Sequence, residues 1–317
     1  MPDDLPGPQS SAPPGPTDPD HDPLDESPPC VLVFNASDPS GAGGLSADLG
    51  AIASVGVHAL PIVTGAYTRD TAEILDHHAF DDEAVSEQAR TVLEDITVQV
   101  IKVGFAGSIE NLSVIAEIAA DYADVPVIAY MPDLSWWNEV QIDLYLDAFR
   151  DLVLPQTTVL VGNHSTLCRW LLPDWQASKP PGPRDIARAA QAAGAAYTLV
   201  TGIPLPDHRI DNVLASPQSV IFSGGVDRLG AGFSGAGDTL SGALAALLAT
   251  QSELGEAVQE ALGYLDRCLE AGFRPGMGHR VPDRLFWAQP EPDEESADNA
   301  DDSTDPRIDF PDHDTKH

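Results

Sequence analysis

The stretch GAGFSGAGDT, residues 230–239, places closely spaced glycines and a carboxylate directly before an apolar run, LSGALAALLA. Small residues at Gly235, Ala236 and Gly237 let consecutive backbone amides converge on one point, and a helix N-terminus adds its dipole. Asp238 follows them and could take a proton from a substrate hydroxyl. The pattern predicts a hole for developing negative charge beside a base, which is the equipment that phosphoryl transfer needs.

Other interpretations of this stretch explain less of it. If the stretch were only a tight helix entry with Asp238 as its cap, the second glycine-rich loop at residues 41–44 would remain unexplained. Residues 230–235 match GxGxxG, but the predicted helix runs into another helix, so no second strand carries the acidic residue of a dinucleotide site. The P-loop pattern GxxxxGK[ST] is absent from the sequence.

The elements around this stretch predict an α/β fold with a mostly parallel central sheet and helices on both faces. Short apolar runs alternate with helical patterns, and an antiparallel pair is expected at 209–216 and 219–224. The runs predicted as the other strands are 30–35, 58–67, 98–105, 126–132, 157–163 and 196–202. Ligands of such sheets bind outside the carboxyl ends of the strands. The unusual stretches that follow these runs therefore predict one shared site.

Composition divides the chain into three parts. Residues 1–29 hold ten prolines and seven acidic residues with no lysine or arginine, and residues 289–317 hold eleven acidic residues against two basic ones. We expect both tails to be disordered, because they bury too little apolar surface to offset the entropy of ordering. The segment between them, residues 30–288, is long enough for one large α/β domain with a full core.

The net charge of −34 limits the kinds of partner that the protein can bind. Without the tails, 32 acidic residues still face 14 basic ones, so the folded body is acidic too. This argues against nucleic acid and against an anionic membrane as partners. The charge is typical of a solvated acidic surface of the halophile kind, although solubility alone also explains it. No apolar run reaches membrane-spanning length and no signal peptide is recognised, which predicts a cytoplasmic protein.

Several motifs resemble those of the ribokinase-like kinases. GAGD before a late apolar helix is similar to the superfamily signature, and SDPSGAGGLSADL, residues 37–49, resembles the first loop of the hydroxymethylpyrimidine/phosphomethylpyrimidine kinases of thiamine biosynthesis, close to SDPSGGAGIQADL. KVGF, residues 102–105, is similar to their KxGM, and RVPDRL after GMGH resembles the ending of one branch. The resemblance spans about residues 30–286.

The resemblance implies a ribokinase-like fold, with ATP and Mg²⁺ used to phosphorylate 4-amino-5-hydroxymethyl-2-methylpyrimidine and then its monophosphate. Asp238 would be the base of this reaction, beside the amides of residues 235–237. Asp48 would face the hydroxymethyl group or the ring amine of the small-molecule pyrimidine substrate. Ala36 would line the pyrimidine pocket, and Phe105 would stack against the ring or flank it.

The same resemblance implies nucleotide contacts. Asn163, Thr201 and Gly202 would lie near the ATP phosphates. Lys102 has two equal interpretations, a cofactor contact or an internal ion pair on a buried strand. The sequence leaves the oligomeric state open, with a homodimer as one expectation.

The sequence departs from the pyrimidine-kinase pattern at four positions. Asp238 stands where those kinases usually have cysteine, and Arg69 stands at the glutamine of their QNT triplet. Met131 replaces the aspartate of DPV, and Thr166 replaces the glutamate of NxxE. An arginine only donates, so Arg69 would suit an anionic or carbonyl-bearing substrate. Mg²⁺ would be held by the ATP phosphates and water, with Asp133 helping, and its protein ligands stay unknown.

These departures leave two further functions open. A kinase of this fold for another hydroxylated small molecule is favoured by Arg69 and Asp238. A non-catalytic ligand-binding protein is favoured by the eroded metal motif at Met131 and Thr166. Two other features carry no functional prediction. His77–His78 are expected in a surface turn, and Trp136–Trp137 are either a lid over the pocket or a hydrophobic cover.

Overall fold

The structure is a computed structural model of the 317-residue chain and describes residues 27–288. The predicted disordered tails, 1–29 and 289–317, lie outside the described residues except for residues 27–29. Among the described residues, no helix is both long and apolar enough to cross a membrane.

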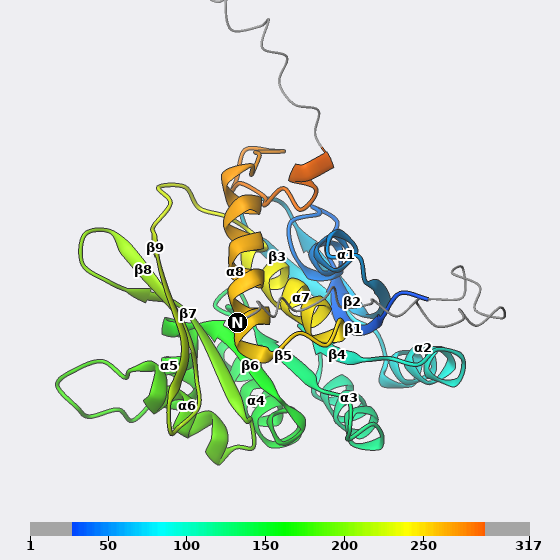
Figure 1. Cartoon of the computed structure of the whole chain (residues 1–317). Helices are drawn as coiled ribbons and strands as arrows, with labels where there is room; N and C mark the ends of the chain where they lie inside the picture. The colour runs from blue at the N-terminus through cyan, green and yellow to red at the C-terminus, as the bar shows by residue number, and fades with distance from the viewer. Residues whose placement is uncertain (1–26, 289–317) are drawn as a thin grey trace, which may run out of the picture.

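A nine-stranded sheet forms the centre of the molecule, in the order β3-β2-β1-β4-β5-β6-β7-β8-β9 (Figure 1). The six central strands, which are β2, β1, β4, β5, β6 and β7 in this order along the sheet, run parallel to one another. The strands β3, β8 and β9 are antiparallel additions at the two edges. The strands are β1 Cys30–Ser37, β2 His58–Arg69, β3 Ile74–Ala79, β4 Val100–Val103, β5 Val127–Met131, β6 Val159–Asn163, β7 Tyr197–Pro204, β8 Arg209–Ala215 and β9 Val220–Asp227.

Helices cover both faces of this sheet, which confirms the predicted fold class. The helices α2 to α6 pack on one face, and α1, α7 and α8 pack on the other. Their bounds are α1 Gly44–Ser54, α2 Asp82–Asp95, α3 Ile109–Asp121, α4 Glu139–Ala148, α5 His164–Leu171, α6 Pro183–Ala192, α7 Ala236–Ala249 and α8 Leu254–Glu270. A π-helical turn, Phe149–Val153, extends α4, and short 3₁₀ turns occur at Leu154–Gln156 and Phe286–Ala288.

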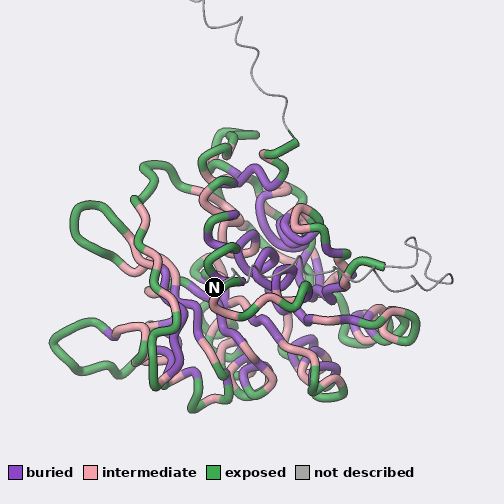
Figure 2. Tube along the Cα trace, viewed as in Figure 1, coloured by how far each residue is buried: buried purple, intermediate pink, exposed green. Residues whose placement is uncertain are grey.

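The central strands read as continuous apolar runs because both of their sides are buried. In β1 every residue before Ser37 is buried, and the four residues of β4 are buried as well, as the purple centre of Figure 2 shows. Such strands lack the alternation of a sheet with one wet face. Lys102 of β4 is the one charged residue in these two runs, so its ammonium must find a partner inside the protein.

At the edges of the sheet, one sequence prediction is confirmed and another is wrong. The antiparallel pair expected at 209–216 and 219–224 is confirmed by β8 and β9. The turn expected at His77–His78 is wrong, because both residues lie on β3, which pairs with β2. Most side chains of β3 are exposed, so this strand carries no apolar alternation that would reveal it.

The parallel strands bring their carboxyl ends to one edge of the sheet. Phe34 of β1 lies beside Val103 of β4, Met131 of β5 lies beside Gly162 of β6, and the next residue along β6, Asn163, lies beside Thr201 of β7. The loops that follow these positions, together with the start of α7, form the region described next.

Candidate active site

Helix α7 begins on a left-handed glycine packed against the first glycine-rich loop. Gly235 has a φ of +83°, and a Cβ there would overlap the carbonyl oxygen of Ala42. The backbone amides of residues 235–237, predicted as the anion hole, donate no hydrogen bond within the described part of the chain, and neither does the amide of Asp238. Free amides at the positive end of a helix dipole suit a phosphate or a developing negative charge.

Arg284 holds the first glycine-rich loop against α7. Its buried guanidinium donates to Thr239 Oγ1 at 2.9 Å, to the carbonyl oxygen of Gly41 at 3.1 Å and to that of Ala42. Burial lowers the pKa of Arg284, although the nearby Asp238 charge opposes this. An arginine keeps its charge in proteins, so these three contacts fix the loop on the helix entrance.

The carboxylate of Asp238 is held from both sides. Its Oδ2 accepts from the amide of Gly44 at 3.1 Å, while its Oδ1 accepts from Asn35 Nδ2 at 3.0 Å and from Lys102 Nζ at 3.2 Å. The side chain is 16% exposed, so it is reachable from solvent. Because Oδ2 accepts a single hydrogen bond here, it retains a lone pair that can take a proton from a substrate hydroxyl.

A buried ion pair between Lys102 and Asp48 contacts Asp238. Lys102 Nζ lies 2.8 Å from Asp48 Oδ1, and both side chains are fully buried. Burial alone would lower the pKa of Lys102, but the charges of Asp48 and Asp238 raise it above its usual value. The pKa of Asp48 is raised to about 6 by burial, against the lowering effect of Lys102. Asn35 completes the group by donating to Asp48 Oδ2 at 2.8 Å.

This geometry bears on two of the residues singled out from the sequence. Of the two interpretations of Lys102, the internal ion pair is the one that the structure contains. Asp48 was expected to face the substrate, but its carboxylate has no exposed surface and points to Lys102 and Asn35. Both side chains contact Asp238 or its hydrogen-bond partners and have no exposed surface in this structure.

Arg69 lies at the end of β2 and pairs with an acid of the first loop. Its Nη1 is 3.3 Å from Asp38 Oδ2, with both side chains largely buried, and its Nη2 donates to Ser234 Oγ at 3.4 Å. Asp38 also accepts from the amides of Ser40 and Gly43. Arg69 thus ties the first loop to the segment before α7, and its guanidinium is already engaged with a carboxylate.

An aromatic cluster surrounds Phe105, the residue expected beside a substrate ring. The Phe105 ring stacks on Tyr67 at 5.6 Å and meets the edge of His77 at 5.0 Å. Trp136 and Trp137 pack on the same ring, at 5.7 and 5.5 Å, so the tryptophans form a hydrophobic cover. Phe105 and Ala36 are each 1% exposed. The part of the predicted pyrimidine pocket at Phe105 and Ala36 is therefore closed in this structure.

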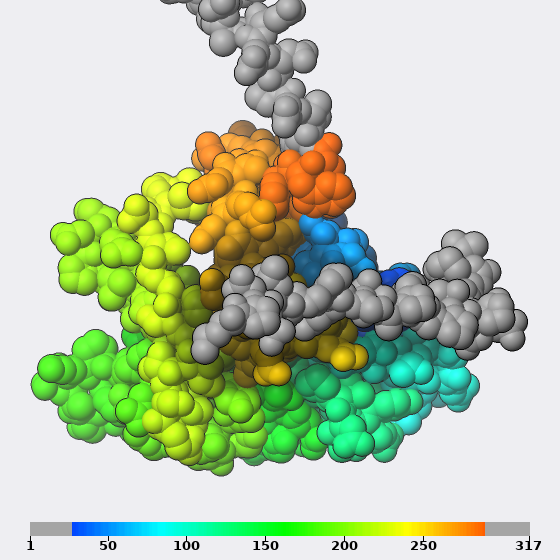
Figure 3. Space-filling model, viewed as in Figure 1, coloured from blue at the N-terminus to red at the C-terminus, as the bar shows by residue number. Residues whose placement is uncertain are grey.

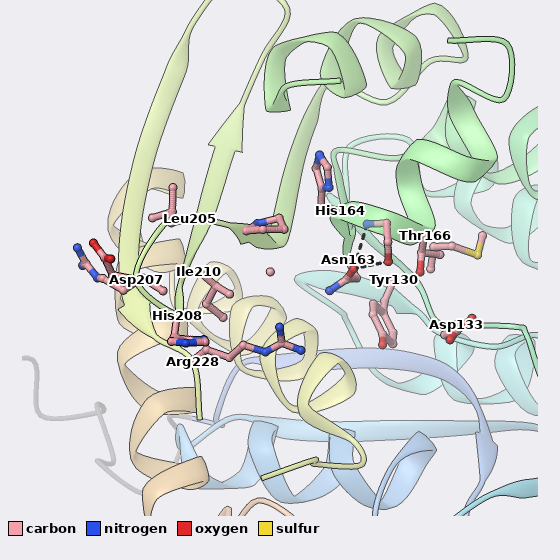
Figure 4. Close-up of a pocket in the computed structure, with 15 residues that line it drawn as sticks. Tyr130, Asp133, Asn163, His164, Thr166, Leu205, Asp207, His208, Ile210 and Arg228 are labelled. Atoms are coloured by element: carbon pink, nitrogen blue, oxygen red, sulfur yellow. Dashed lines mark hydrogen bonds between the residues drawn. The ribbon is translucent and has the colours of Figure 1, made fainter. Parts of the chain in front are cut away.

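A large cavity opens at the carboxyl ends of β5, β6 and β7 (Figure 4). Its volume is about 1020 Å³, and its wall includes Tyr130, Asp133, Asn163, Thr166 and Arg228. The side-chain oxygen of Asn163 is used as the N-cap of α5, where it accepts from the amide and the hydroxyl of Ser165. The Asn163 amide group therefore remains as the donor that this residue can offer to a ligand.

A second cavity, of about 570 Å³, connects this region to the start of α7. Val226 of β9 and Leu265 of α8 line it together with Ala236, and the surface is hollowed between the β9 segment and α8 (Figure 3). Thr201 and Gly202 also belong to its wall. Asn163, Gly202, Ile210 and Arg228 line both cavities, so the two form one groove.

Two backbone features shape the wall at Thr201 and Gly202. Thr201 Oγ1 donates to the carbonyl oxygen of Gly162 at 3.3 Å. Gly202 has a φ of +67°, and a Cβ there would lie 2.6 Å from Asn163 Nδ2. Glycine at this position therefore leaves room for the Asn163 amide group.

Sequence reasoning missed five residues of this region. They are Asn35, Asp38, Tyr130, Arg228 and Arg284. Asn35 is a buried polar residue inside the apolar strand β1, and a polar residue at that position is a signal that could have been used. The others come from separate loops and strands, and only the folded chain brings them together.

Comparison with known proteins identifies the family. The family model described as phosphomethylpyrimidine kinase matches residues 38–283. A hydroxymethylpyrimidine/phosphomethylpyrimidine kinase of Mycobacterium tuberculosis is 30% identical over 268 residues, which cover 82% of this chain and 94% of the relative. A thiamine biosynthetic bifunctional enzyme of Arabidopsis thaliana is 28% identical over 257 residues, which cover 76% of this chain and 47% of that longer enzyme.

A solved structure shows the same fold. Pyridoxal kinase from Staphylococcus aureus, in complex with AMP-PCP and pyridoxal, superposes with a TM-score of 0.72 at 19% sequence identity. The match covers 83% of this chain and 95% of the pyridoxal kinase. The expected ribokinase-like fold is therefore confirmed.

The close approach of Gly235 to Ala42 predicts unequal costs for two glycine substitutions. Gly41 and Gly235 both have positive φ, but nothing lies within 4 Å of a Cβ built at Gly41. We expect Gly41→Ala to lower the free energy of unfolding by about 1–2 kcal/mol, the cost of a left-handed alanine. Gly235→Ala should cost clearly more, because the Ala42 loop must also move. Urea unfolding of both variants measures this, and equal losses would contradict the tight packing of the two loops.

The raised pKa of Asp48 predicts a pH-dependent stability. The folded protein holds the Asp48 proton up to about pH 6, whereas an unfolded aspartate releases it near pH 3.9. The stabilisation from this proton is complete below about pH 4 and is lost as the pH rises through 6.

The measurement compares the wild type with Asp48→Asn by denaturant unfolding at several pH values. Titrations shared by the two proteins cancel, so the free energy of unfolding of the wild type should fall relative to that of the variant between pH 4 and 7. A constant difference across this range would show that Asp48 has no raised pKa.

Proposed function

The chain belongs to the phosphomethylpyrimidine kinase family, and we propose that it transfers a phosphoryl group from ATP to 4-amino-5-hydroxymethyl-2-methylpyrimidine and to its monophosphate, as a step of thiamine biosynthesis. The observation that carries this proposal is the position of Asp238. Its partly exposed carboxylate lies beside three backbone amides that have no partner among the described residues. Phosphoryl transfer to a hydroxyl requires a base and an anion hole at the same point.

The groove between β9 and α8 fits a nucleotide. Apolar side chains of β9 and α8 line the groove, with carboxylates of the same segments among them, and Ala236 brings the start of α7 and its free amides to the same wall. We place the base of ATP along this apolar wall and its phosphates toward α7, with Thr201, Gly202 and Asn163 beside them. The complex of the Staphylococcus aureus pyridoxal kinase with AMP-PCP supports a nucleotide site on this fold.

The residues of the groove offer few ligands for a metal ion. Among residues 27–288, no group of three or more His, Cys, Asp or Glu side chains could hold one. Asp133 is a carboxylate on the cavity wall, where it accepts from Ser135 and pairs with Arg169 at 3.4 Å. Mg²⁺ commonly binds through one carboxylate, phosphates and water, so Asp133 fits as its single protein ligand. Bound there, the ion would neutralise phosphate charge.

In the proposed reaction, Asp238 Oδ2 accepts the proton of the hydroxymethyl group as the hydroxymethyl oxygen attacks the terminal phosphorus of ATP. The bond from that phosphorus to the bridging oxygen breaks, and ADP leaves. Lys102 and Asn35 hold Oδ1, so the carboxylate cannot rotate away from the substrate. The amides of residues 236–238 donate to the oxygens of the transferring phosphoryl group. These donors are already oriented, so the transition state is stabilised without reorganisation.

The acceptor must displace part of the aromatic cluster. Phe105 and Ala36 are the positions proposed for the pyrimidine, and the tryptophan cover closes them in this structure. Trp136 and Trp137 lie between the end of β5 and the start of α4, outside both elements. Movement of this segment would open the ring site without disturbing the central sheet.

A second candidate function is phosphorylation of another hydroxylated small molecule. It is favoured by Arg69, which stands at the position of a ring-reading glutamine and is paired with Asp38. A non-catalytic ligand-binding role is the remaining alternative, and Thr166 and Met131 at the metal motif favour it. Three finer expectations belong to the main proposal and rest on the sequence and its resemblance: Mg²⁺ accompanies ATP, the protein acts in the cytoplasm, and two copies associate as a homodimer.

The proposal predicts that ADP forms from ATP and Mg²⁺ only when hydroxymethylpyrimidine is added. Asp238→Asn should lower the rate by about 10²–10⁴-fold, since it removes the general base while Lys102 keeps its Asp48 partner. Asp121→Asn is the matched control, because Asp121 is an exposed, ion-paired aspartate and should leave the rate unchanged.

The assay is run at low and at high salt, since so acidic a chain can require salt to fold. Turnover with other hydroxylated compounds but not with the pyrimidine would favour the second candidate. A folded protein that binds ATP but forms no ADP with either would establish the non-catalytic role instead.

A further inference from the structure

Arg228 has no acidic partner among the described residues, although the protein is rich in acids. The chain carries 50 acidic residues against 16 lysines and arginines, so carboxylates are available to most basic side chains. The guanidinium of Arg228 nevertheless makes no ion pair or hydrogen bond with any residue in the range 27–288. Arg209, on the same cavity wall, lies 3.6 Å from Asp227 and donates to the carbonyl oxygen of Gly225. Arg228 thus keeps its donors available for a ligand.

The position of Arg228 is specific. It follows β9 and lines both cavities of the groove, the one that reaches Ala236 and the one that reaches Asn163 and Thr166. Arg228 is the only lysine or arginine on the wall of the smaller cavity. In Figure 4 its side chain extends into the larger cavity, toward Asn163 and Tyr130.

The backbone around Arg228 is anchored. Its amide donates to the carbonyl oxygen of His208 at 2.9 Å, which fastens the end of β9 to the turn between β7 and β8. This contact fixes where the Arg228 side chain starts, although the guanidinium itself is exposed. A ligand therefore meets an arginine whose backbone is already in place, and only the side chain must be ordered.

Arg228 and the free amides of α7 are the groups of the groove that suit an anion, and the carboxylates that also line its walls make a basic anchor for phosphates more necessary. The site proposed for the phosphates runs past Arg228, between the amides of α7 and the Asn163 amide group. Thr166, at the position of a metal-organising glutamate, provides no carboxylate there. A guanidinium forms two parallel hydrogen bonds with phosphate oxygens and carries its charge permanently. It can neutralise part of the charge that a metal ion would otherwise neutralise.

We propose that Arg228 binds the β- and γ-phosphates of the nucleotide, so that this chain holds ATP with less dependence on Mg²⁺. The inference rests on the proposed function, in which ATP is the phosphoryl donor. Arg228 acts as a nucleotide-binding residue at the junction of the two cavities. The ligand class is a nucleoside di- or triphosphate, recognised by its phosphate charge.

Isothermal titration calorimetry with ATP, ADP and adenosine tests this, in Mg²⁺ and in EDTA. The wild type is compared with Arg228→Gln, Arg228→Lys and the matched control Arg274→Gln, whose arginine is also exposed and unpaired among the described residues. We expect Arg228→Gln to weaken ATP binding by about tenfold or more, the value of a charge-assisted hydrogen bond. Adenosine affinity should stay unchanged, and the loss should be larger in EDTA than in Mg²⁺.

The lysine variant should recover part of the ATP affinity, and the control should bind as the wild type does. If the wild type binds ATP and Arg228→Gln binds it equally well, the inference fails while the proposed function stands. If the wild type binds no adenine nucleotide under either condition, both fail. An equal loss of ATP and adenosine affinity in Arg228→Gln would also overturn the inference, because the residue would then support the groove and not the phosphates.

Discussion

The buried ammonium of Lys102 is the constraint on which the site depends. It comes from β4, and its two carboxylate partners come from α1 and α7. Removing one partner of a buried ion pair leaves a charge without compensation and costs about 3–5 kcal/mol. The three segments must therefore meet in one arrangement, and that arrangement sets the position of Asp238. Asn35 from β1 closes the same group, so four separate elements fix one carboxylate.

The two sides of Asp238 differ, and this difference suggests the order in which the two substrates of the proposed reaction bind. On the nucleotide side, the groove is open and its cavities have volumes of about 1020 and 570 Å³. On the acceptor side, Phe105 is packed among aromatic rings and the predicted ring pocket is closed. In the proposed reaction, ATP would therefore enter an open groove, while the acceptor would first have to move the tryptophan cover.

Much of the fold and the centre of the site were predictable from the sequence. Apolar runs alternating with helical patterns predicted the parallel sheet, and the glycines before α7 predicted its free amides. The edge strand β3 was missed because its exposed side chains lack a pattern. The partners of Asp238 could not be deduced either. Lys102 and Asn35 lie more than 130 residues from it along the chain, and only the order of the strands brings them together.

The most direct test of this account is a crystal structure of the protein with ADP, beryllium fluoride and hydroxymethylpyrimidine. The beryllium fluoride group imitates the tetrahedral terminal phosphoryl group of ATP, poised for transfer. We predict that it lies within hydrogen-bonding distance of the amides of residues 236–238, with Asp238 Oδ2 facing the substrate hydroxyl and Lys102 still paired with Oδ1. A fluoride group bound away from these amides, or a hydroxyl directed to another base, would contradict the account.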